Sequence, residues 1–316
     1  MAQSVEQLIR NQQAAGSSPA SSSRKALARA GAFLFYANGG SVMGYKQCLH
    51  THSILCDGKD TLEEMVLTAI EKGFDSIGFS GHSFMDIYAE FSMSEEKVAQ
   101  YKAEIKRLQQ TYGDRIKIYC GLEKDNYTTL STEGYDYLIG SVHVMKYKDQ
   151  LLFIDWTAER TRETIEQVFH GDGVAYAKHY FETVADLPNH GKFDILGHFD
   201  LLTKFNEKEP DLFDTECEGY KAAAIAAAEA LVGKVKFFEV NTGAISRGYR
   251  TTPYPAPFII KEMYRLGFGA IISSDCHDRN FLDCGYEDAK RLLKEAGFTE
   301  HYVLKDEGFV AIPLED

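Results

Sequence analysis

The sequence of 316 residues lacks long hydrophobic runs, paired cysteine motifs and any excess of positive charge. No apolar run approaches the ~20 residues that a membrane-spanning helix needs, so the sequence predicts no transmembrane segment. The net charge of -13 argues against a general binder of nucleic acid or anionic membranes, because such surfaces need clustered Lys and Arg. Any phosphate site is therefore expected to be local, with the few cations placed at the phosphate.

The six cysteines include no CxxC pair and lack the dense, even spacing of a secreted disulfide scaffold. We therefore expect reduced thiols and a cytoplasmic protein. Apolar residues make up 44% of the sequence and charged residues 26%, which is enough to bury a substantial core and to exclude wholesale disorder. The sequence thus predicts a globular protein, and its length is compatible with a single α/β barrel.

Residues 1–42 differ in composition from the rest of the sequence. They are rich in Ser, Ala, Gly and Gln, carry Glu6 as their only acidic residue, and show little patterned hydrophobicity, so we expect a poorly ordered extension. A basic, Ser-rich targeting peptide is one explanation. The other, which we favour, is a misplaced start, with Met43 directly before "GYKQCLHTHS". The folded domain is expected over residues 43–316.

Short apolar runs alternate with longer amphipathic stretches from residue 44 onward. Strands are expected at 46–50, 75–82, 115–123, 136–143, 194–200, 236–242 and 269–275. Helices are expected at 61–73, 94–113, 218–233, 257–267 and 286–298, and around a break within 161–187, with 286–298 closing the series. This alternation is typical of a parallel sheet wrapped by helices, either an open doubly wound sheet or a closed barrel.

Potential metal ligands stand at the ends of successive predicted strands: His50, His52, His82, Glu123, His143, His198, Asp275 and His277. Functional groups of α/β barrels gather at the carboxyl ends of the strands, so this placement favours the barrel. Each residue alone has an ordinary explanation, such as a buried histidine satisfied by a backbone carbonyl. Their joint placement indicates metal binding. The remaining histidines fall on predicted helices or loops and receive no role: His170, His179, His190 and His301.

Imidazole nitrogens together with carboxylate oxygens suit divalent Zn, Mn or Fe. The ligands are too many for one tetrahedral ion, so two or three ions are expected. Clustered metals suit the hydrolysis of phosphate esters, because they lower the pKa of bound water and neutralise charge as the ester bond breaks.

Several stretches of the sequence occur in the order and approximate spacing found in the PHP (polymerase and histidinol phosphatase) superfamily. They are "HTHSILCDG", "GFSGHS", "GLEKD", "GSVH", "ILGHFDLLTKF", "EVNTG" and "SSDCH". Residues 43–316 resemble in particular the monofunctional histidinol-phosphate phosphatases of this superfamily. The resemblance implies a distorted (β/α)7 barrel of the PHP type with a trinuclear metal centre.

The resemblance also implies which residues hold each ion. The first ion would be held by His50, His52, Glu123 and Asp275. Glu123 would bridge to a second ion, held also by His143 and His198. The third would be held by Asp57, His82 and His277. Catalytic roles are implied for Asp57, Glu123 and Asp275, and Asp57 is either a ligand or the proton donor to the leaving alkoxide.

Two basic residues lie where the family places phosphate contacts. Lys204 follows the "GHFDLL" stretch and Arg247 follows "EVNTG". Arginine recognises phosphate with two parallel hydrogen bonds, whereas lysine acts as a point charge. The alternative is that both are solvated surface cations. Tyr254 and Arg279 are weaker candidates for lining the same pocket.

The sequence therefore predicts a phosphoric monoester hydrolase that converts L-histidinol phosphate to L-histidinol and phosphate in histidine biosynthesis. The alternative is a PHP phosphoesterase acting on a nucleotide, a sugar phosphate or phosphotyrosine. A proofreading or regulatory module that binds nucleic acid or a polymerase is disfavoured by the acidic charge. The expected partner is a small phosphate monoester, with no nucleic acid and no membrane. The sequence leaves the oligomeric state open.

Overall fold

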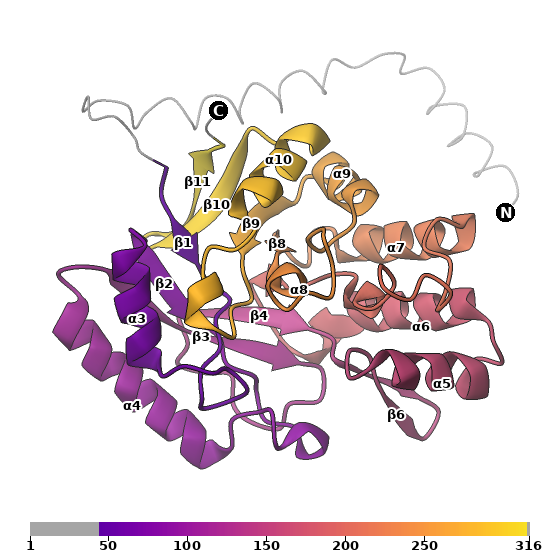
Figure 1. Ribbon diagram of the computed structural model, residues 1–316, viewed down its shortest axis with the longest axis horizontal. Helices are drawn as coiled ribbons and strands as arrows, with labels where there is room; N and C mark the ends of the chain where they lie inside the picture. The colour runs from indigo at the N-terminus through magenta and orange to yellow at the C-terminus, as the bar shows by residue number, and fades with distance from the viewer. Residues whose placement is uncertain (1–43, 315–316) are drawn as a thin grey trace, which may run out of the picture. The chain divides into compact units, whose positions relative to one another are not determined.

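Seven parallel strands form the central sheet of residues 44–314, the part of the chain that the computed structural model describes (Figure 1). The predicted extension at 1–42 lies outside these residues. The strand order is β1-β2-β3-β4-β7-β8-β9. The bounds are β1 Gln47–Cys48, β2 Ser76–Phe79, β3 Lys117–Asp125, β4 Tyr137–Ser141, β7 Ile195–Leu196, β8 Phe237–Asn241 and β9 Gly269–Ser273. Every predicted strand is present in the sheet.

The sheet closes on itself just beyond the carboxyl ends of β1 and β9. The backbone N–H of His52 donates to the carbonyl of Cys276 over 2.9 Å, and the N–H of Cys276 donates to the carbonyl of His50 over 3.0 Å. These two bonds form a parallel bridge between Thr51 and Cys276. The architecture is therefore the predicted seven-stranded α/β barrel, and the open doubly wound alternative is wrong.

Helices surround the strands, as Figure 1 shows for α3 and α4 on one side and for α5, α6 and α7 on another. The bounds are α3 Leu62–Glu71, α4 Glu95–Tyr112, α5 Ala158–Val168, α6 Gly173–Asp186, α7 Glu218–Leu231, α8 Gly243–Ser246, α9 Pro257–Leu266 and α10 Tyr286–Ala296. Short 3-10 turns are η1 Asp86–Tyr88, η2 Leu187–His190, η3 Leu201–Thr203 and η4 Arg279–Phe281. No helix of the described residues is long and apolar enough to cross a membrane.

Local signals in the sequence explain where the first helices begin. At α3, the Thr61 hydroxyl accepts from the N–H of Glu64, and the Glu64 carboxylate accepts from the N–H of Thr61. This capping box satisfies backbone groups that have no partner inside the helix. At α4, the Ser94 hydroxyl caps the helix by accepting from the N–H of Lys97. The buried face of α3 carries the four apolar residues at helical spacing: Leu62, Met65, Val66 and Ala69.

The interior of the barrel is filled by side chains that point inward from the strands. Tyr137 lies at its centre, and its hydroxyl donates to the carbonyls of Leu49 and Phe79, the latter at 3.1 Å. A Cβ atom on Gly121 would lie 2.2 Å from the Tyr137 ring, and one on Gly78 would lie 2.4 Å from its hydroxyl. Glycines on β2 and β3 thus make room for this buried tyrosine inside the barrel.

Two antiparallel hairpins lie outside the central sheet, and neither was predicted from the sequence. β5 Val144–Tyr147 pairs with β6 Gln150–Phe153, and β10 Glu300–Lys305 pairs with β11 Gly308–Pro313. Residues 286–298 therefore do not close the series. The β10–β11 hairpin places Leu304 in the apolar cluster inside the barrel. His301, expected on a helix or loop, lies in strand β10.

Candidate metal centre

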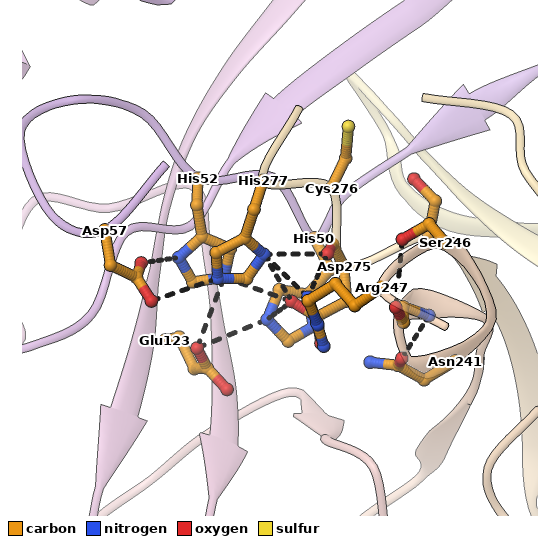
Figure 2. Close-up of polar contacts among 12 residues, drawn as sticks. His50, His52, Asp57, Glu123, Asn241, Ser246, Arg247, Asp275, Cys276 and His277 are labelled. Atoms are coloured by element: carbon orange, nitrogen blue, oxygen red, sulfur yellow. Dashed lines mark hydrogen bonds and ion pairs between the residues drawn. The ribbon is translucent and has the colours of Figure 1, made fainter. Parts of the chain in front are cut away.

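The predicted metal ligands gather at the rim formed by the carboxyl ends of the strands. Figure 2 shows six of them: His50, His52, Asp57, Glu123, Asp275 and His277. The closure bonds place Cys276 beside the His50–His52 segment, so Asp275 and His277 face the same two histidines. The rings of His52 and His277 stack with their centroids 4.1 Å apart. Closure of the barrel thus brings together predicted ligands that lie more than 200 residues apart in the chain.

Glu123, at the end of β3, lies at the centre of the cluster, and 1% of its side chain is exposed. One carboxylate oxygen, Oε2, lies 3.2 Å from His50 Nε2 and 2.8 Å from His82 Nδ1. The other, Oε1, lies 3.0 Å from His198 Nε2 and 3.4 Å from His143 Nε2. Each oxygen therefore faces a different set of imidazoles, which is the geometry that a carboxylate needs to bridge two ions.

A second group of donors surrounds Asp57. Its Oδ2 atom lies 3.1 Å from His277 Nε2 and 3.6 Å from His82 Nε2, and its Oδ1 atom lies 3.3 Å from His52 Nδ1. The residues implied for the third ion are thus together. His52, implied for the first ion, belongs to this group as well, because its Nε2 atom faces Glu123 at 3.5 Å while its Nδ1 atom faces Asp57.

Several donor atoms at the centre are buried and have no hydrogen-bond partner among the described residues. They are His50 Nε2, His52 Nε2, Asp57 Oδ1 and Glu123 Oε2. Buried polar atoms without partners are rare in folded proteins, because each has lost its water. His50 Nε2 and His52 Nε2 both face Glu123 Oε2, at 3.2 and 3.5 Å, while Asp57 Oδ1 faces His52 Nδ1 at 3.3 Å. Divalent cations bound among these atoms would satisfy them. The donor set of imidazole nitrogens and carboxylate oxygens fits Zn, Mn or Fe.

The charges of the site hold its carboxylates in the ionised form that binds metals. Burial raises the pKa of Glu123, but His50 and His82 lower it by more. The pKa of Glu123 therefore lies well below its usual range. Burial also raises the pKa of Asp275, which Arg247 and His50 bring well below its usual range. Both residues are anionic at neutral pH.

Glu239 on β8 belongs to the site, and the sequence analysis did not identify it. Its carboxylate lies 2.9 Å from His50 Nδ1 and accepts from the backbone N–H of His198 at 2.7 Å. Asn241 Nδ2 and Ser273 Oγ also donate to it, at 2.7 and 2.5 Å. A carboxylate behind a metal-binding imidazole fixes the orientation and tautomer of the ring. The signal available in the sequence was a lone acid within the apolar strand "FFEVN".

Arg247 lies at the cluster and is not a solvated surface cation. Its guanidinium contacts Asp275 Oδ2 at 2.9 Å and His277 Nδ1 at 2.8 Å. Asp275 itself has a φ angle of 46°, which is unusual for a residue other than glycine. Gly243 makes this packing possible, because a Cβ atom there would lie 2.7 Å from the Cβ of Asp275.

Lys204 is also mostly buried, with 12% of its side chain exposed. Its ammonium group binds Asp155, a residue that the sequence analysis did not identify, rather than solvent. Tyr254 is fully buried, and its ring lies 6.4 Å from that of His198. Arg279 is 41% exposed, and its guanidinium forms ion pairs with Asp60 and Glu64 near the start of α3. These ion pairs hold it near α3.

Comparison with solved structures identifies the same fold. A protein from Listeria monocytogenes has a TM-score of 0.65 and 21% identity, over 77% of this chain and 99% of that one. Histidinol phosphate phosphatase from Lactococcus lactis, solved with Zn, L-histidinol and phosphate, has a TM-score of 0.60 and 22% identity, over 84% and 98%. At these identities the likeness shows the shared barrel.

Curated sequences give relatives over most of the chain. The Schizosaccharomyces pombe protein named "Probable histidinol-phosphatase" is 27% identical over 79% of this chain and 86% of its own length. Histidinol-phosphatase from Bacillus subtilis is 26% identical over 75% and 96%. The family model named PHP domain matches residues 49–243, a segment that runs from the first histidine pair to the start of α8 and covers most of the barrel. The chain therefore belongs to the PHP family.

Proposed function

We propose that the chain is a metal-dependent phosphatase that hydrolyses L-histidinol phosphate to L-histidinol and phosphate in histidine biosynthesis. The observation that carries the proposal is the convergence of five imidazoles on the two oxygens of Glu123. A shared carboxylate between clustered ions is suited to phosphate ester hydrolysis. The relatives named histidinol-phosphatase, and the bound L-histidinol and phosphate in the Lactococcus lactis structure, supply the substrate.

Three groups of donor atoms, each within 4.8 Å of one another, would hold the ions. They are His52, Asp57, His82 and His277; His50, His52 and Glu123; and His82, Glu123 and His143. His198 and Asp275 lie beside these groups, at 3.0 Å from Glu123 and 3.4 Å from His52. Bound divalent ions would supply Lewis acidity, which lowers the pKa of water and neutralises the phosphate.

Asp57 acts as a metal ligand in this proposal, and the proton-donor alternative is set aside. Both of its carboxylate oxygens face imidazole nitrogens, at 3.1 Å for His277 and 3.3 Å for His52. A proton donor to the leaving alkoxide would need one oxygen directed toward the substrate. The contacts on both oxygens support the ligand role.

Arg247 and Lys204 are the proposed phosphate contacts. The guanidinium of Arg247 is held beside the metal ligands by Asp275 and His277, and its planar fork suits two phosphate oxygens. Lys204 follows His198 by two short turns, because Leu201 N–H donates to the His198 carbonyl and Lys204 N–H donates to the Leu201 carbonyl. Both cations are local, as an acidic protein that binds phosphate requires.

The proposed substrate is a small phosphate monoester, and we propose a cytoplasmic enzyme that acts without nucleic acid or a membrane. The net charge of -13 supports a substrate other than nucleic acid, because binding nucleic acid needs clustered positive charge. The six unpaired cysteines support a reducing compartment.

Phosphate release from a substrate panel tests the proposal. The protein is purified without chelator, supplied with Mn, Zn or Fe(II) in turn, and assayed with L-histidinol phosphate, AMP, glucose 6-phosphate and phosphotyrosine. We expect the highest kcat/KM with L-histidinol phosphate, by at least about tenfold, which corresponds to ~1.4 kcal/mol of transition-state binding. A preference for any of the other three esters would support the alternative PHP phosphoesterase and overturn the proposal.

Metal analysis of the same preparation tests the centre itself. We expect more than one equivalent of Mn, Fe or Zn per chain. Removal of the metal should abolish turnover, and at least one of the three ions should restore it. An apo protein that none of them reactivates contradicts the proposed chemistry.

A further inference from the structure

The β5–β6 hairpin carries Asp155 to the edge of the metal centre. His143 comes directly before β5, and Val144 pairs with Phe153 in the hairpin. The chain then continues alongside His143, because the N–H of Ile154 donates to the His143 carbonyl at 2.9 Å. Asp155 is the next residue. Its position is therefore set by the hairpin and by one backbone hydrogen bond from its neighbour Ile154 to His143, a proposed metal ligand.

Asp155 and Lys204 form an ion pair at this edge. The Lys204 Nζ atom donates to the main-chain carbonyl of Asp155 at 2.8 Å and lies 3.2 Å from its Oδ2 atom. The ammonium also lies 4.8 Å from the centre of the Tyr249 ring and 5.4 Å from that of Phe205. The lysine is thus held in one place, with its charge beside the carboxylate.

The pair is partly buried and remains reachable from solvent. The exposed fraction is 19% for the Asp155 side chain and 12% for Lys204. Burial raises the pKa of Asp155, but Lys204, His143 and His198 together bring that pKa well below its usual range. The carboxylate is therefore negative at neutral pH, on the β4–β7 side of the metal centre.

We propose that the Asp155–Lys204 pair recognises the 2-ammonioethyl phosphate unit of the substrate, with Asp155 accepting from the ammonium and Lys204 contacting the phosphate. The inference rests on the proposed function. In L-histidinol phosphate the ammonium and the phosphate ester oxygen stand on adjacent carbon atoms, so opposite charges lie side by side. The protein also presents a negative and a positive charge side by side, with the Asp155 carboxylate complementary to the ammonium and the Lys204 ammonium complementary to the phosphate.

Such a pair supplies a selectivity that the rest of the centre lacks. The proposed metal ligands and Arg247 address only the phosphoryl group, which every phosphate monoester carries. An ammonium next to the ester distinguishes an amino-alcohol phosphate from a sugar phosphate or a nucleotide. Because Asp155 is mostly out of water, its attraction for a cation is stronger than that of a surface carboxylate.

A competing role for Asp155 is purely positional, since it holds Lys204 by two contacts. The two roles differ in one measurable way. A positioning residue affects every phosphate substrate alike, whereas recognition of the ammonium affects only substrates that have one.

Steady-state kinetics of Asp155→Asn on two substrates separates these roles. The substrates are L-histidinol phosphate and its deamino analogue, 3-(imidazol-4-yl)propyl phosphate. We expect kcat/KM for L-histidinol phosphate to fall about 10- to 100-fold, mostly through KM, as for the loss of one charged hydrogen bond. The value for the deamino analogue should change less than about threefold. The matched control is Asp149→Asn, an exposed aspartate in the turn of the same hairpin, which should leave both substrates unaffected.

Equal losses on both substrates would overturn the recognition role and leave Asp155 as a support for Lys204. A wild-type protein that does not hydrolyse L-histidinol phosphate would instead refute the proposed function, so the two failures are distinguishable.

Fluorescence gives a second readout that does not depend on turnover. Trp156 follows Asp155, is half exposed and is the only tryptophan in the chain. L-histidinol should change its emission in the metal-loaded wild type with an apparent Kd that weakens at least about tenfold in Asp155→Asn, in line with the kinetic loss. Binding of equal strength in both proteins contradicts the inference.

Discussion

Single residues in this barrel carry charge in places where water cannot reach them, and each buried charge has specific partners. Glu123 has imidazoles on both oxygens, and Glu239 has an imidazole, a main-chain N–H, an amide and a hydroxyl. Removing one partner of such a group costs far more than the pair contributes, because the other charge is left uncompensated. The residues of the centre are therefore expected to act as a unit.

Glu123→Gln tests whether the residues of the centre act together, because Glu123 contacts most of its imidazoles. Loss of outer partners of metal ligands costs 10- to 100-fold in metal affinity or activity, so loss of a bridging ligand should lower kcat/KM more than about 100-fold. Metal content should fall, while the circular dichroism spectrum stays native. Glu133→Gln, at an exposed loop position, is the control and should keep full activity. Near-normal rates in Glu123→Gln would show that this carboxylate does not bridge the ions.

The buried His301 on β10 is expected to make the free energy of unfolding depend on pH in the acidic range. Burial, with a smaller effect of Lys290, lowers its pKa to about 4 in the folded protein, whereas the unfolded chain has the ordinary value near 6.5. Below pH 6.5 the unfolded state binds a proton that the folded state refuses, so the free energy of unfolding falls as the pH falls from 6.5 toward 4. Linkage gives a loss of about 2 kcal/mol at pH 5 from this residue.

His301→Gln should remove that part of the acid sensitivity. The measurement is denaturant unfolding of both proteins at pH 7 and at pH 5, with the difference between the two pH values compared. Lys290→Gln should act in the same direction but more weakly, because only the electrostatic part of the shift is removed. An identical pH dependence in wild type and His301→Gln would show that the imidazole is protonated as readily in the fold as outside it.

Elements differ in how far the sequence predicts them. Helix α3 was predicted because its apolar spacing is local in the sequence. The two hairpins were missed because their strands are short, and because their pairing depends on contacts with parts of the barrel that are distant in the sequence. The gathering of the strand-end His, Asp and Glu side chains was predicted because parallel strands in a barrel share one rim. Asp155 and Glu239 were not, since the first depends on the β5–β6 pairing and the second on the inward direction of one side chain of β8.

The β10–β11 hairpin covers the end of the barrel opposite the metal centre. Gln47, at the start of β1, makes two hydrogen bonds to the backbone of Leu304 in this hairpin. Its Nε2 donates to the Leu304 carbonyl at 2.8 Å, and its Oε1 accepts from the Leu304 N–H at 2.7 Å. The Leu304 side chain is 6% exposed and packs in the apolar cluster inside the barrel. The hairpin therefore contributes to stability and lies away from the chemistry.

Leu304→Ala should lower the free energy of unfolding by about 2 to 4 kcal/mol, the usual cost of emptying a buried leucine site. At temperatures below the unfolding transition, kcat and KM should remain those of the wild type. Leu67→Ala on α3, where the leucine is 43% exposed, is the matched control and should change stability by less than about 1 kcal/mol. A loss of activity in folded Leu304→Ala would show that the two ends of the barrel are coupled.

The barrel as a whole is joined at the metal centre. The first and last strands of the sheet meet through two backbone hydrogen bonds beyond their ends, and proposed ligands flank this bridge on both strands. Ions held by both sides would clamp the closure of the barrel. Without them, four buried atoms at the centre make no hydrogen bond among the described residues: His50 Nε2, His52 Nε2, Asp57 Oδ1 and Glu123 Oε2. Metal binding is thus expected to contribute to folding stability as well as to catalysis.

Chelation of the metal should therefore lower the Tm. A ligand that binds only the folded state stabilises it by ~2.7 kcal/mol at 100 times its Kd, which for a domain of this size corresponds to roughly 5 to 10 °C. The measurement is thermal unfolding of metal-loaded protein, of apo protein, and of apo protein to which Mn or Zn is returned. The Tm should recover on return of the ion, and Glu123→Gln should show a smaller shift because one shared ligand is lost. Equal Tm values for loaded and apo wild type would mean that the bridge between β1 and β9 closes the barrel without the ions.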